Sequence, residues 1–473
     1  MSANKTMMKR VSTLRVNLSL MAAAMALAGC ANLAPTHERP APPVAPNWPQ
    51  AAAPVQGNAA QALAWQQFYA GDARLRALIE LALQNNRDLR VAALNAEQAR
   101  AQARVSDASR WPTISAGLIS SRATASNDRI SSSYSAGLQV SAYEVDLLGK
   151  LKNNSDAAAA RYLASVEGQR AAQITLVASV AAAHLALQAD EALLALAERT
   201  QASRSDSLRL IRLRFDAGVA SVLDLRSAES AEAAARASLA QLQRQRAQDE
   251  NALVLLLGQA LPAALPAATP LERLALAEVP AGLPSDVLVQ RPDVLQAEQQ
   301  LIAANASIGA ARAAFFPAIT LTASAGSASG QLSDLFKNGA WSFASQLLMP
   351  IFDAGRLDAN LASVKAGREI AQAQYEKAIQ LAFREVADAL AGNATLGQQL
   401  QAQTVQTQAE RDRLALVELR HRQGAAGSLE LLDAQRASFA AEQALVQVQL
   451  AQALNRVQAY KALGGGVSQA LRH

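Results

Sequence analysis

Cysteine and histidine are both scarce in this chain of 473 residues. Cys30 is the only cysteine, so no disulfide bond within the chain contributes to its stability. The four histidines show no paired spacing such as His-Glu-x-x-His, which binds zinc. A glycine-rich phosphate loop and a serine nucleophile elbow are absent as well. We therefore expect no enzyme activity, no catalytic residue, no metal site and no cofactor.

Long apolar runs are also missing after the N-terminal leader. Hydrophobic residues make up 51% of the sequence, but much of this share is alanine. No run of about 18 apolar residues is available to cross a bilayer as a helix. Any segment that crosses a membrane is therefore expected to be a β-strand.

The N-terminus has the features of an exported lipoprotein. Four basic residues precede an apolar run at positions 16–27, which is typical of a signal peptide, and we assign residues 1–29 to it. Leu-Ala-Gly-Cys, ending at Cys30, resembles the bacterial lipoprotein box, which implies a covalent lipid (palmitate included) on Cys30 and cleavage just before it. The alternative is a stray thiol in a discarded leader. No acidic residue follows Cys30 directly, and by the same resemblance this favours the outer membrane.

The formal net charge of +5 is misleading. The signal peptide contains four basic residues and no acidic residue, so the mature chain has a net charge of only +1. Basic and acidic residues alternate along the mature chain, and we expect no binding of nucleic acid. Residues 30–62 are rich in proline and alanine, which keeps a segment extended, so they are expected to tether the lipid to the folded body.

The body of the chain is a tandem duplication. Residues 63–258 form the first repeat and residues 291–464 form the second. A proline-rich connector at 259–290 separates them, and a tail at 465–473 follows. We expect the two repeats to fold alike, since a helical pattern, an alternating pattern and a long helical pattern follow one another in both.

Each repeat contains a long hairpin of two helices. The long segments lack proline and are rich in alanine, leucine and glutamine, which favour helix. Each segment is interrupted once, near Gly218 in the first repeat and near Gly424 in the second. The eight residues that begin at Val222 align without a gap with those that begin at Ser428. In the last arm, apolar residues recur every seven positions, which predicts a coiled-coil seam.

The sequence period changes from about 3.6 to 2 after a proline in each repeat. Apolar residues alternate with Ser, Thr, Gln or Gly at 113–145 and at 318–351, which predicts four strands in two hairpins. Such strands are typical of outer-membrane barrels, whereas a soluble hairpin that covers a core is the alternative. Four strands cannot close a barrel, so two copies would supply eight strands and three copies would supply twelve, with room for a pore.

Several short motifs carry a family resemblance. Arg291-Pro292-Asp293-Val294 opens the second repeat, and the stretches Tyr143–Lys150 and Pro350–Arg356 lead into the long helices. With the tip motifs Phe215–Gly218 and Leu431–Arg436, they resemble the outer membrane efflux family of TolC-like outer membrane factors. The resemblance covers nearly the whole mature chain. Within the family, the lipoprotein box resembles the lipoprotein branch that includes OprM and NodT-type proteins.

The resemblance implies a mainly α-helical fold with a membrane β-barrel portion. Long helical hairpins would form an α-barrel, and four β-strands per chain would complete a twelve-stranded barrel in a homotrimer. The protein would sit in the bacterial outer membrane, lipid-anchored and barrel-inserted, with its helical body in the periplasm. It would dock onto a periplasmic adaptor (membrane fusion) protein and an inner-membrane transporter of the RND type. Its role would be a passive exit duct for small toxic compounds or drugs.

Two other functions stay open from the residues alone. A lipid-anchored periplasmic coiled-coil adaptor or scaffold would also use long helical hairpins and a lipid. An outer membrane conduit of a type I protein secretion system would share the channel fold and differ in its cargo. The sequence does not name the exported substrate.

The two helix turns are the candidate functional site. In the family the tunnel closes where the helices converge at these periplasmic tips. We hypothesise that charged residues beside the two turn glycines take part in tip closure or adaptor contact, with a solvated helix face as the alternative for each. The residues concerned are Arg214, Asp216, Gly218, Asp224, Arg422, Gly424 and Glu430.

Overall fold

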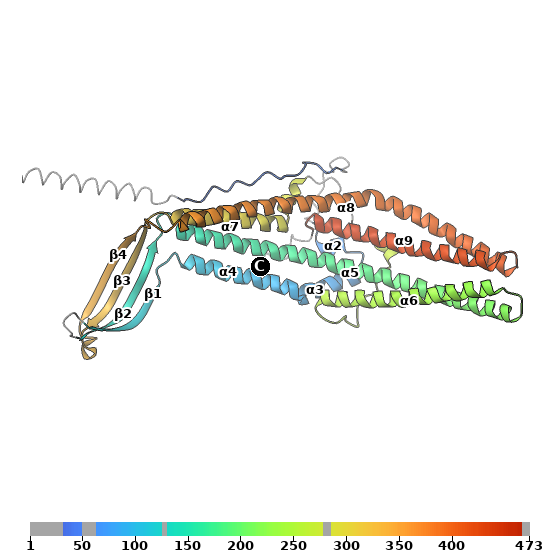
Figure 1. Cartoon of the computed structure of the whole chain (residues 1–473), viewed down its shortest axis with the longest axis horizontal. Coiled ribbons are helices and arrows are strands. Elements are labelled where there is room, and N and C mark those ends of the chain that lie inside the picture. Colours follow the sequence, from blue (N-terminus) through green and yellow to red (C-terminus); the bar gives the residue numbers. More distant parts are fainter. Residues whose placement is uncertain (1–31, 50–62, 125–129, 278–284, 466–473) are drawn as a thin grey trace, which may run out of the picture. The chain divides into compact units, whose positions relative to one another are not determined.

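The computed structural model describes residues 32–49, 63–124, 130–277 and 285–465 (Figure 1). The predicted signal peptide, Cys30 and part of the predicted tether, residues 30–31 and 50–62, lie outside these residues. The chain divides into two compact units. The strand unit comprises Met1–Ala41, Asn95–Val166 and Gln296–Glu376, and the hairpin unit comprises Pro42–Leu94, Glu167–Leu295 and Lys377–His473.

Long helices account for most of both repeats. The first hairpin consists of α5 (Lys150–Asp216) and α6 (Val222–Leu257), and the second of α8 (Arg356–Arg422) and α9 (Ser428–Ala462). Shorter helices are α2 (Trp65–Phe68), α3 (Ala73–Asn85), α4 (Arg87–Ala108) and α7 (Pro292–Ala313), with 3-10 turns η2 (Leu271–Arg273) and η3 (Ser285–Gln290) in the connector. Since α5 and α8 both contain 67 residues, the repeats have kept the same helix length. The predicted mainly helical fold is confirmed.

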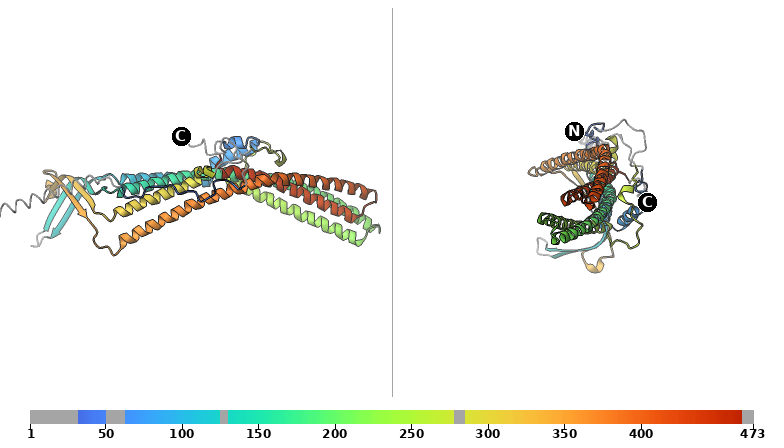
Figure 2. Two further views of the ribbon diagram at one scale, coloured as in Figure 1. Left: turned by 90° about the horizontal axis from the view of Figure 1, so that it is seen from above. Right: turned by 90° about the vertical axis from the view of Figure 1, so that its right-hand side faces the viewer.

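Within the hairpin unit the two long hairpins lie side by side, because α6 contacts α9 (Figure 2). The coiled-coil seam predicted for the last arm is partly buried there: Leu432, Val457 and Tyr460 are almost inaccessible to solvent. The seven-residue repeat to which they belong therefore reflects packing against neighbouring helices rather than a solvated face.

The four strands form one antiparallel sheet in the order β1-β2-β3-β4. The strands are β1 (Ile114–Thr124), β2 (Ile130–Val145), β3 (Ala318–Ser329) and β4 (Gly339–Leu348), with a 3-10 turn η4 (Leu332–Asp334) between the last two. Pairing of β2 with β3 joins the hairpins of the two repeats. β4 ends at Leu348, three residues before the predicted end at 351, because Pro350 has no N–H group for the ladder.

The sheet has one apolar and one polar face. Directly paired residues of antiparallel strands share a face, and the register places Ile114 opposite Val140, Val140 opposite Ala323, and Ala323 opposite Phe343. The other face carries serine, threonine, glutamine and glycine, for example Gln139 opposite Ser324. The apolar face is exposed in the single chain, and Trp341 is 81% accessible to solvent.

Two glycines face each other where β2 pairs with β3. A Cβ atom on Gly137 would collide with the backbone of Ala325 and Gly326, and a Cβ atom on Gly326 would collide with Ala136 and Gly137. Only glycine at both positions allows this close approach of the two backbones.

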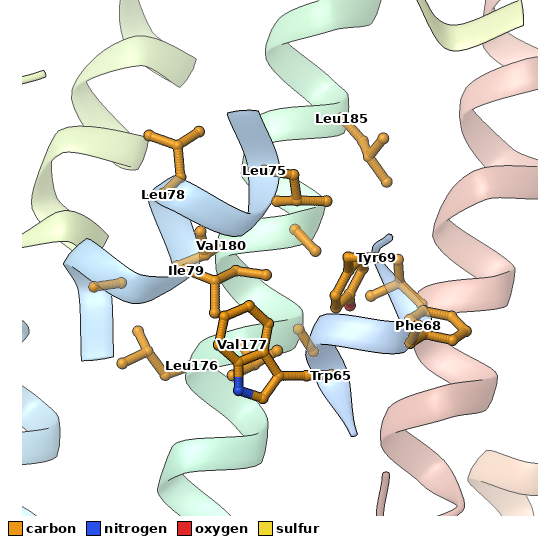
Figure 3. Close-up of a cluster of buried hydrophobic side chains, with 14 of the residues drawn as sticks. Trp65, Phe68, Tyr69, Leu75, Leu78, Ile79, Leu176, Val177, Val180 and Leu185 are labelled. Atoms are coloured by element: carbon orange, nitrogen blue, oxygen red, sulfur yellow. The ribbon is translucent and has the colours of Figure 1, made fainter. Parts of the chain in front are cut away.

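The main hydrophobic core lies in the hairpin unit, where α2 and α3 pack on the middle of α5 and the ends of α6 and α9 (Figure 3). The aromatic rings of Phe68 and Tyr460 stack with their centroids 4.1 Å apart, and Tyr69 packs edge-on against Phe68. The Tyr460 hydroxyl donates a hydrogen bond to the Leu63 carbonyl at 2.6 Å. These contacts hold the N-terminal helices and the C-terminal helix around α5.

One helix in the described part of the chain is apolar enough to cross a membrane by composition, contrary to the sequence prediction. An 18-residue window of α5 has a mean hydropathy of 1.4, and 44% of it is buried. The same helix supplies Leu176, Val177 and Val180 to the core (Figure 3). The apolar character of α5 is therefore explained by packing inside the protein.

Arg291, the first residue of the Arg-Pro-Asp-Val motif, links three helices of the hairpin unit. Its guanidinium donates to Asp293 beside it at 2.6 and 3.0 Å, and to Glu385 of α8 at 2.8 Å. It also donates to the Ala462 carbonyl at the end of α9 at 2.6 Å. Because only 6% of Arg291 is exposed, these partners are needed to offset the loss of hydration.

An N-terminal arm, residues 32–41, packs on α7 within the strand unit. Arg39 and Glu298 form a bidentate ion pair at 2.6 and 2.7 Å. Near the other end of the arm, Arg312 donates to the Leu33 carbonyl at 3.0 Å. A Cβ atom on Gly309 would lie 2.7 Å from the backbone nitrogen of Ala34, so glycine allows the arm to lie close to the helix.

Two buried polar residues of α5 differ in how they are satisfied. His184 is 2% exposed, and its Nε2 lies 3.2 Å from the carboxylate of Asp72, the N-cap of α3. Asp190 is 7% exposed, and its Oδ2 has no hydrogen-bond partner in the described residues. Burial, followed by the hydrogen bond and charge of Asp249, raises the pKa of Asp190 to about 7.

This pKa predicts a pH-dependent stability. The carboxyl of Asp190 keeps its proton in the folded state up to about pH 7, whereas in the unfolded chain it ionises near the ordinary pKa of 3.8. Its contribution to stability is therefore lost as pH rises between these values. The difference in unfolding free energy between Asp190→Asn and the native protein should grow in favour of the variant as the pH rises from 4 to 8. The expected growth is on the order of 3 kcal/mol after allowance for screening by solvent. Guanidinium unfolding followed by circular dichroism measures the difference.

The exposed Asp206 on the same helix supplies the control, because Asp206→Asn also removes one carboxylate. A stability difference between native and Asp190→Asn that is constant across this pH range would show that folding does not raise the pKa of Asp190.

Candidate functional site at the two helix turns

Both long hairpins turn with the same backbone geometry. Gly218 and Gly424 have φ angles of 73° and 75°, in the left-handed region that favours glycine. Behind each glycine, a six-to-one hydrogen bond closes the helix: Val219 N–H donates to Arg214 O, and Ala425 N–H donates to Arg420 O, both at 2.8 Å. This is a Schellman motif. No atom of the described chain lies within 4 Å of a Cβ placed on either glycine, so conformation and not space requires glycine here.

The helix after the first turn starts with a capping box. Asp224 N–H donates to Ser221 Oγ at 3.1 Å, and Ser221 N–H donates to the Asp224 carboxylate at 3.2 Å. The Ser221 hydroxyl also donates to that carboxylate at 2.6 Å. The two side chains therefore satisfy each other's free backbone N–H groups at the start of α6.

The helix after the second turn has no such cap, because its N-cap residue is Gly427. Glu430, three residues later, instead accepts from Arg420 Nη1 at 2.6 Å. Arg420 also donates to the Ala425 carbonyl at 3.2 Å, so this one side chain joins the end of α8, the turn and the start of α9.

An arginine and an acidic residue stand at equivalent positions in the two turns and differ in their partners. Arg214 and Arg420 each stand four residues before the turn glycine, and Asp224 and Glu430 each stand six residues after it. The serine at 221, in place of glycine, directs Asp224 to the helix cap. Arg214 then makes no side-chain hydrogen bond or ion pair with any residue that the structure describes.

The other predicted residues are also exposed. Asp216 has no side-chain partner among the described residues, and Arg422 donates only to the Glu418 carbonyl of its own helix, at 3.4 Å. The predicted set omitted Arg420 and Ser221, which make the contacts that distinguish the two turns. Arg420 could have been found from the sequence as the counterpart of Arg214.

Further ion pairs cross each hairpin beyond the turn. Glu229 of α6 accepts from Arg226 at 2.8 Å and from Arg212 of α5 at 3.0 Å, and these two hydrogen bonds lower the pKa of Glu229. In the second hairpin, Arg413 of α8 donates to Asp433 of α9 at 2.7 Å. All are solvent-accessible, so each contributes little to stability and mainly fixes the pairing of the arms.

Apolar side chains surround the charged residues at both turns. Val219, Leu223 and Leu429 are 75%, 77% and 70% exposed. In the part of the chain that the structure describes, no group of three His, Cys, Asp or Glu residues is arranged to hold a metal ion. The turns offer a contact surface with mixed apolar and charged character.

Comparisons with known proteins agree on one family. The family model described as "Outer membrane efflux protein" matches residues 78–259 and 283–465. The toluene efflux pump outer membrane protein TtgC of Pseudomonas putida is 47% identical over 462 residues, 95% of each chain. Outer membrane protein OprJ of Pseudomonas aeruginosa is 43% identical, again with 95% of each chain covered. The open state of the Neisseria gonorrhoeae MtrE outer membrane channel superposes with a TM-score of 0.85 at 38% identity, covering 93% of this chain and 100% of that one.

The difference between the two caps predicts an exchange of partners. Gly427→Ser places a serine three residues before Glu430, so Glu430 should turn to the helix cap and leave Arg420. A double-mutant cycle on Arg420 and Glu430 should give a coupling of about 0.2–1 kcal/mol in the native background and close to zero with Gly427→Ser.

The reverse substitution is the matched control. Ser221→Gly should release Asp224 and create a coupling between Asp224 and Arg214 that the native protein lacks. If neither coupling changes, the serine does not decide which partner the acidic residue takes.

Proposed function

The chain belongs to the outer membrane efflux protein family, and from this membership we propose that it is the trimeric channel of a tripartite efflux pump. It gives small toxic compounds a passive route from the periplasm to the exterior. The observation that carries the proposal is the four-stranded sheet, which has an exposed apolar face and two edges that no strand of the described chain covers.

The edges support a trimer. β1 pairs only with β2 and β4 pairs only with β3 within the described residues, so the outer N–H and C=O groups of both edge strands need partners from other chains. In a closed ring, β4 of one copy pairs with β1 of the next. Three copies give twelve strands, which leave an interior wide enough for solutes, whereas eight strands are filled by side chains.

The two faces of the sheet support the same arrangement. The face with Trp341 and Phe343 suits contact with lipid, and the serine- and glycine-rich face suits a water-filled interior. The long hairpins of three copies would continue this passage as an α-barrel of twelve long helices in the periplasm.

The helix turns are proposed to close the periplasmic end. Arg420 holds the start of α9 against the end of α8 through Glu430 and the Ala425 carbonyl, which favours one compact arrangement of the turn. The exposed apolar side chains near the turns suit contact with neighbouring copies and with a periplasmic adaptor protein. We propose that the adaptor connects the channel to an inner-membrane transporter of the RND type, which supplies the energy and selects the substrate.

We propose that the channel has no enzymatic role, because its task is passive conduction. Apolar solvents and antibiotics are the proposed cargo, by analogy with the pumps named for the relatives. The conduit of a protein secretion system would share the barrel and tunnel, and a transport assay with the partner pump separates the two. A soluble scaffold would not require a sheet whose apolar face is exposed along β4.

A lipid on Cys30 fits the position of the N-terminal arm. The arm is held on α7 near Gly309 and Arg312, a few residues before β3 begins at Ala318. Cys30 precedes the arm by two residues, and two residues span at most about 7 Å. A lipid there would enter the membrane that the strands cross.

Loss of the Arg420–Glu430 pair should open the channel. We expect Arg420→Ala to raise the single-channel conductance of the purified trimer in a planar bilayer several-fold, since the turn loses the side chain that fixes it. Glu430→Gln should give a similar increase, and the double variant no further one, because both substitutions break one contact.

Arg209→Ala is the control. Arg209 is an exposed arginine of α5, in an ion pair with Asp206 one turn away on the same helix. Equal conductance of Arg420→Ala and the control would remove Arg420 from tip closure. A native protein that is monomeric and silent would overturn the channel itself.

The lipid is tested separately. Cells grown with radiolabelled palmitate should label the native protein and not Cys30→Ser, while Glu298→Gln, which weakens the arm, should still be labelled. Label on Cys30→Ser would exclude Cys30 as the attachment site.

A further inference from the structure

A cavity of about 560 Å³ lies in the hairpin unit between α5, α6 and α9. Three arginines line it, one from each helix: Arg204, Arg226 and Arg436. Thr200, Ser227 and Ser230 add hydroxyl groups to the same wall. Among the described residues no carboxylate lines this cavity, so its charged groups are all positive.

Arg204 is buried without a partner. Only 5% of this residue is exposed, yet its guanidinium makes no hydrogen bond or ion pair with any residue in the described ranges. Burial, and then the positive charge of Arg436, lower the pKa of Arg204. A buried guanidinium has five N–H donors to satisfy, so leaving them without a partner in the chain is costly.

Three of the four carboxylates in the surroundings have other contacts. Glu229 pairs with Arg226 and Arg212, and Glu232 pairs with Arg236 at 2.9 Å. A smaller cavity that Arg204 also lines includes Glu418 and Glu442. Glu442 accepts from Arg411 at 2.8 Å, and Glu418 forms no ion pair within 4 Å among the described residues.

We propose that the larger cavity binds a small oxyanion from solution, a phosphate, sulfate or organic acid, through Arg204 and Arg436. Guanidinium groups hold such anions through two parallel N–H bonds, and they strengthen each other when two converge on one ligand. Hydroxyl donors on Thr200, Ser227 and Ser230 supply the remaining hydrogen bonds. The volume also accommodates an organic body, which would lie against the apolar side chains of Leu429 and Phe439.

Binding there would act on the pairing of the two hairpins. Arg204 belongs to the first hairpin and Arg436 to the second, and without an anion their like charges repel. An oxyanion between them replaces this repulsion by two attractions. The inference does not depend on the trimer or on the transport role.

The test measures binding of inorganic phosphate to the full-length protein in detergent. Equilibrium dialysis against radiolabelled phosphate in a phosphate-free amine buffer should show saturable binding of one phosphate per chain. Arg204→Met and Arg436→Met should each weaken this binding at least tenfold. Arg209→Met removes an exposed arginine of the same helix outside the cavity and should leave binding unchanged.

A second measurement covers the case in which Arg204→Met disturbs folding. Ser230→Cys, in a Cys30→Ser background, places a single thiol at the cavity. A negatively charged methanethiosulfonate should modify it faster than a positively charged one, phosphate should slow the negative reagent, and Arg436→Met, at an exposed position, should remove the preference. Absence of phosphate binding, or binding that survives both arginine substitutions, overturns the proposal.

Discussion

Backbone hydrogen bonding in the membrane is the constraint on which this architecture depends. Within lipid, each unpaired N–H or C=O group costs several kcal/mol, so a sheet must close on itself. The chain supplies four strands whose edges, β1 and β4, are unpaired in the described residues. Long helices, in contrast, satisfy their own backbone groups. The strands therefore make association necessary, while the helices tolerate movement at the turns.

Duplication has produced two hairpins of the same length with different chemistry. Where serine stands at 221 the following acidic residue caps its helix, and where glycine stands at 427 it pairs with an arginine. The charges that remain unpaired therefore differ between the two turns, with Arg214 free of side-chain partners among the described residues. Arg204 also lacks an acidic partner among the described residues. Its charge can therefore bind an anion from solution.

Much of the fold follows from local sequence. The helices follow from alanine- and leucine-rich runs without proline, and the turns at Gly218 and Gly424 follow from the glycines that interrupt those runs. The strands were predicted because apolar and polar residues alternate with period 2, as they do when the two faces of a sheet lie in different environments. Where Pro350 follows β4, a local rule would have given the correct end as well.

Contacts between distant segments could not be predicted from the sequence. Residues far apart in the chain are joined by the pairing of β2 with β3 and by the hydrogen bonds of Arg291 with Glu385 and Ala462. The burial of Arg204 likewise depends on distant segments. No periodicity encodes such pairs. The sequence by itself determined the element types, the duplication and the turn positions, because these depend on neighbouring residues. The tertiary structure decided the partners of each charge, because a side chain of several rotatable bonds takes its contact from whatever the packing brings near it.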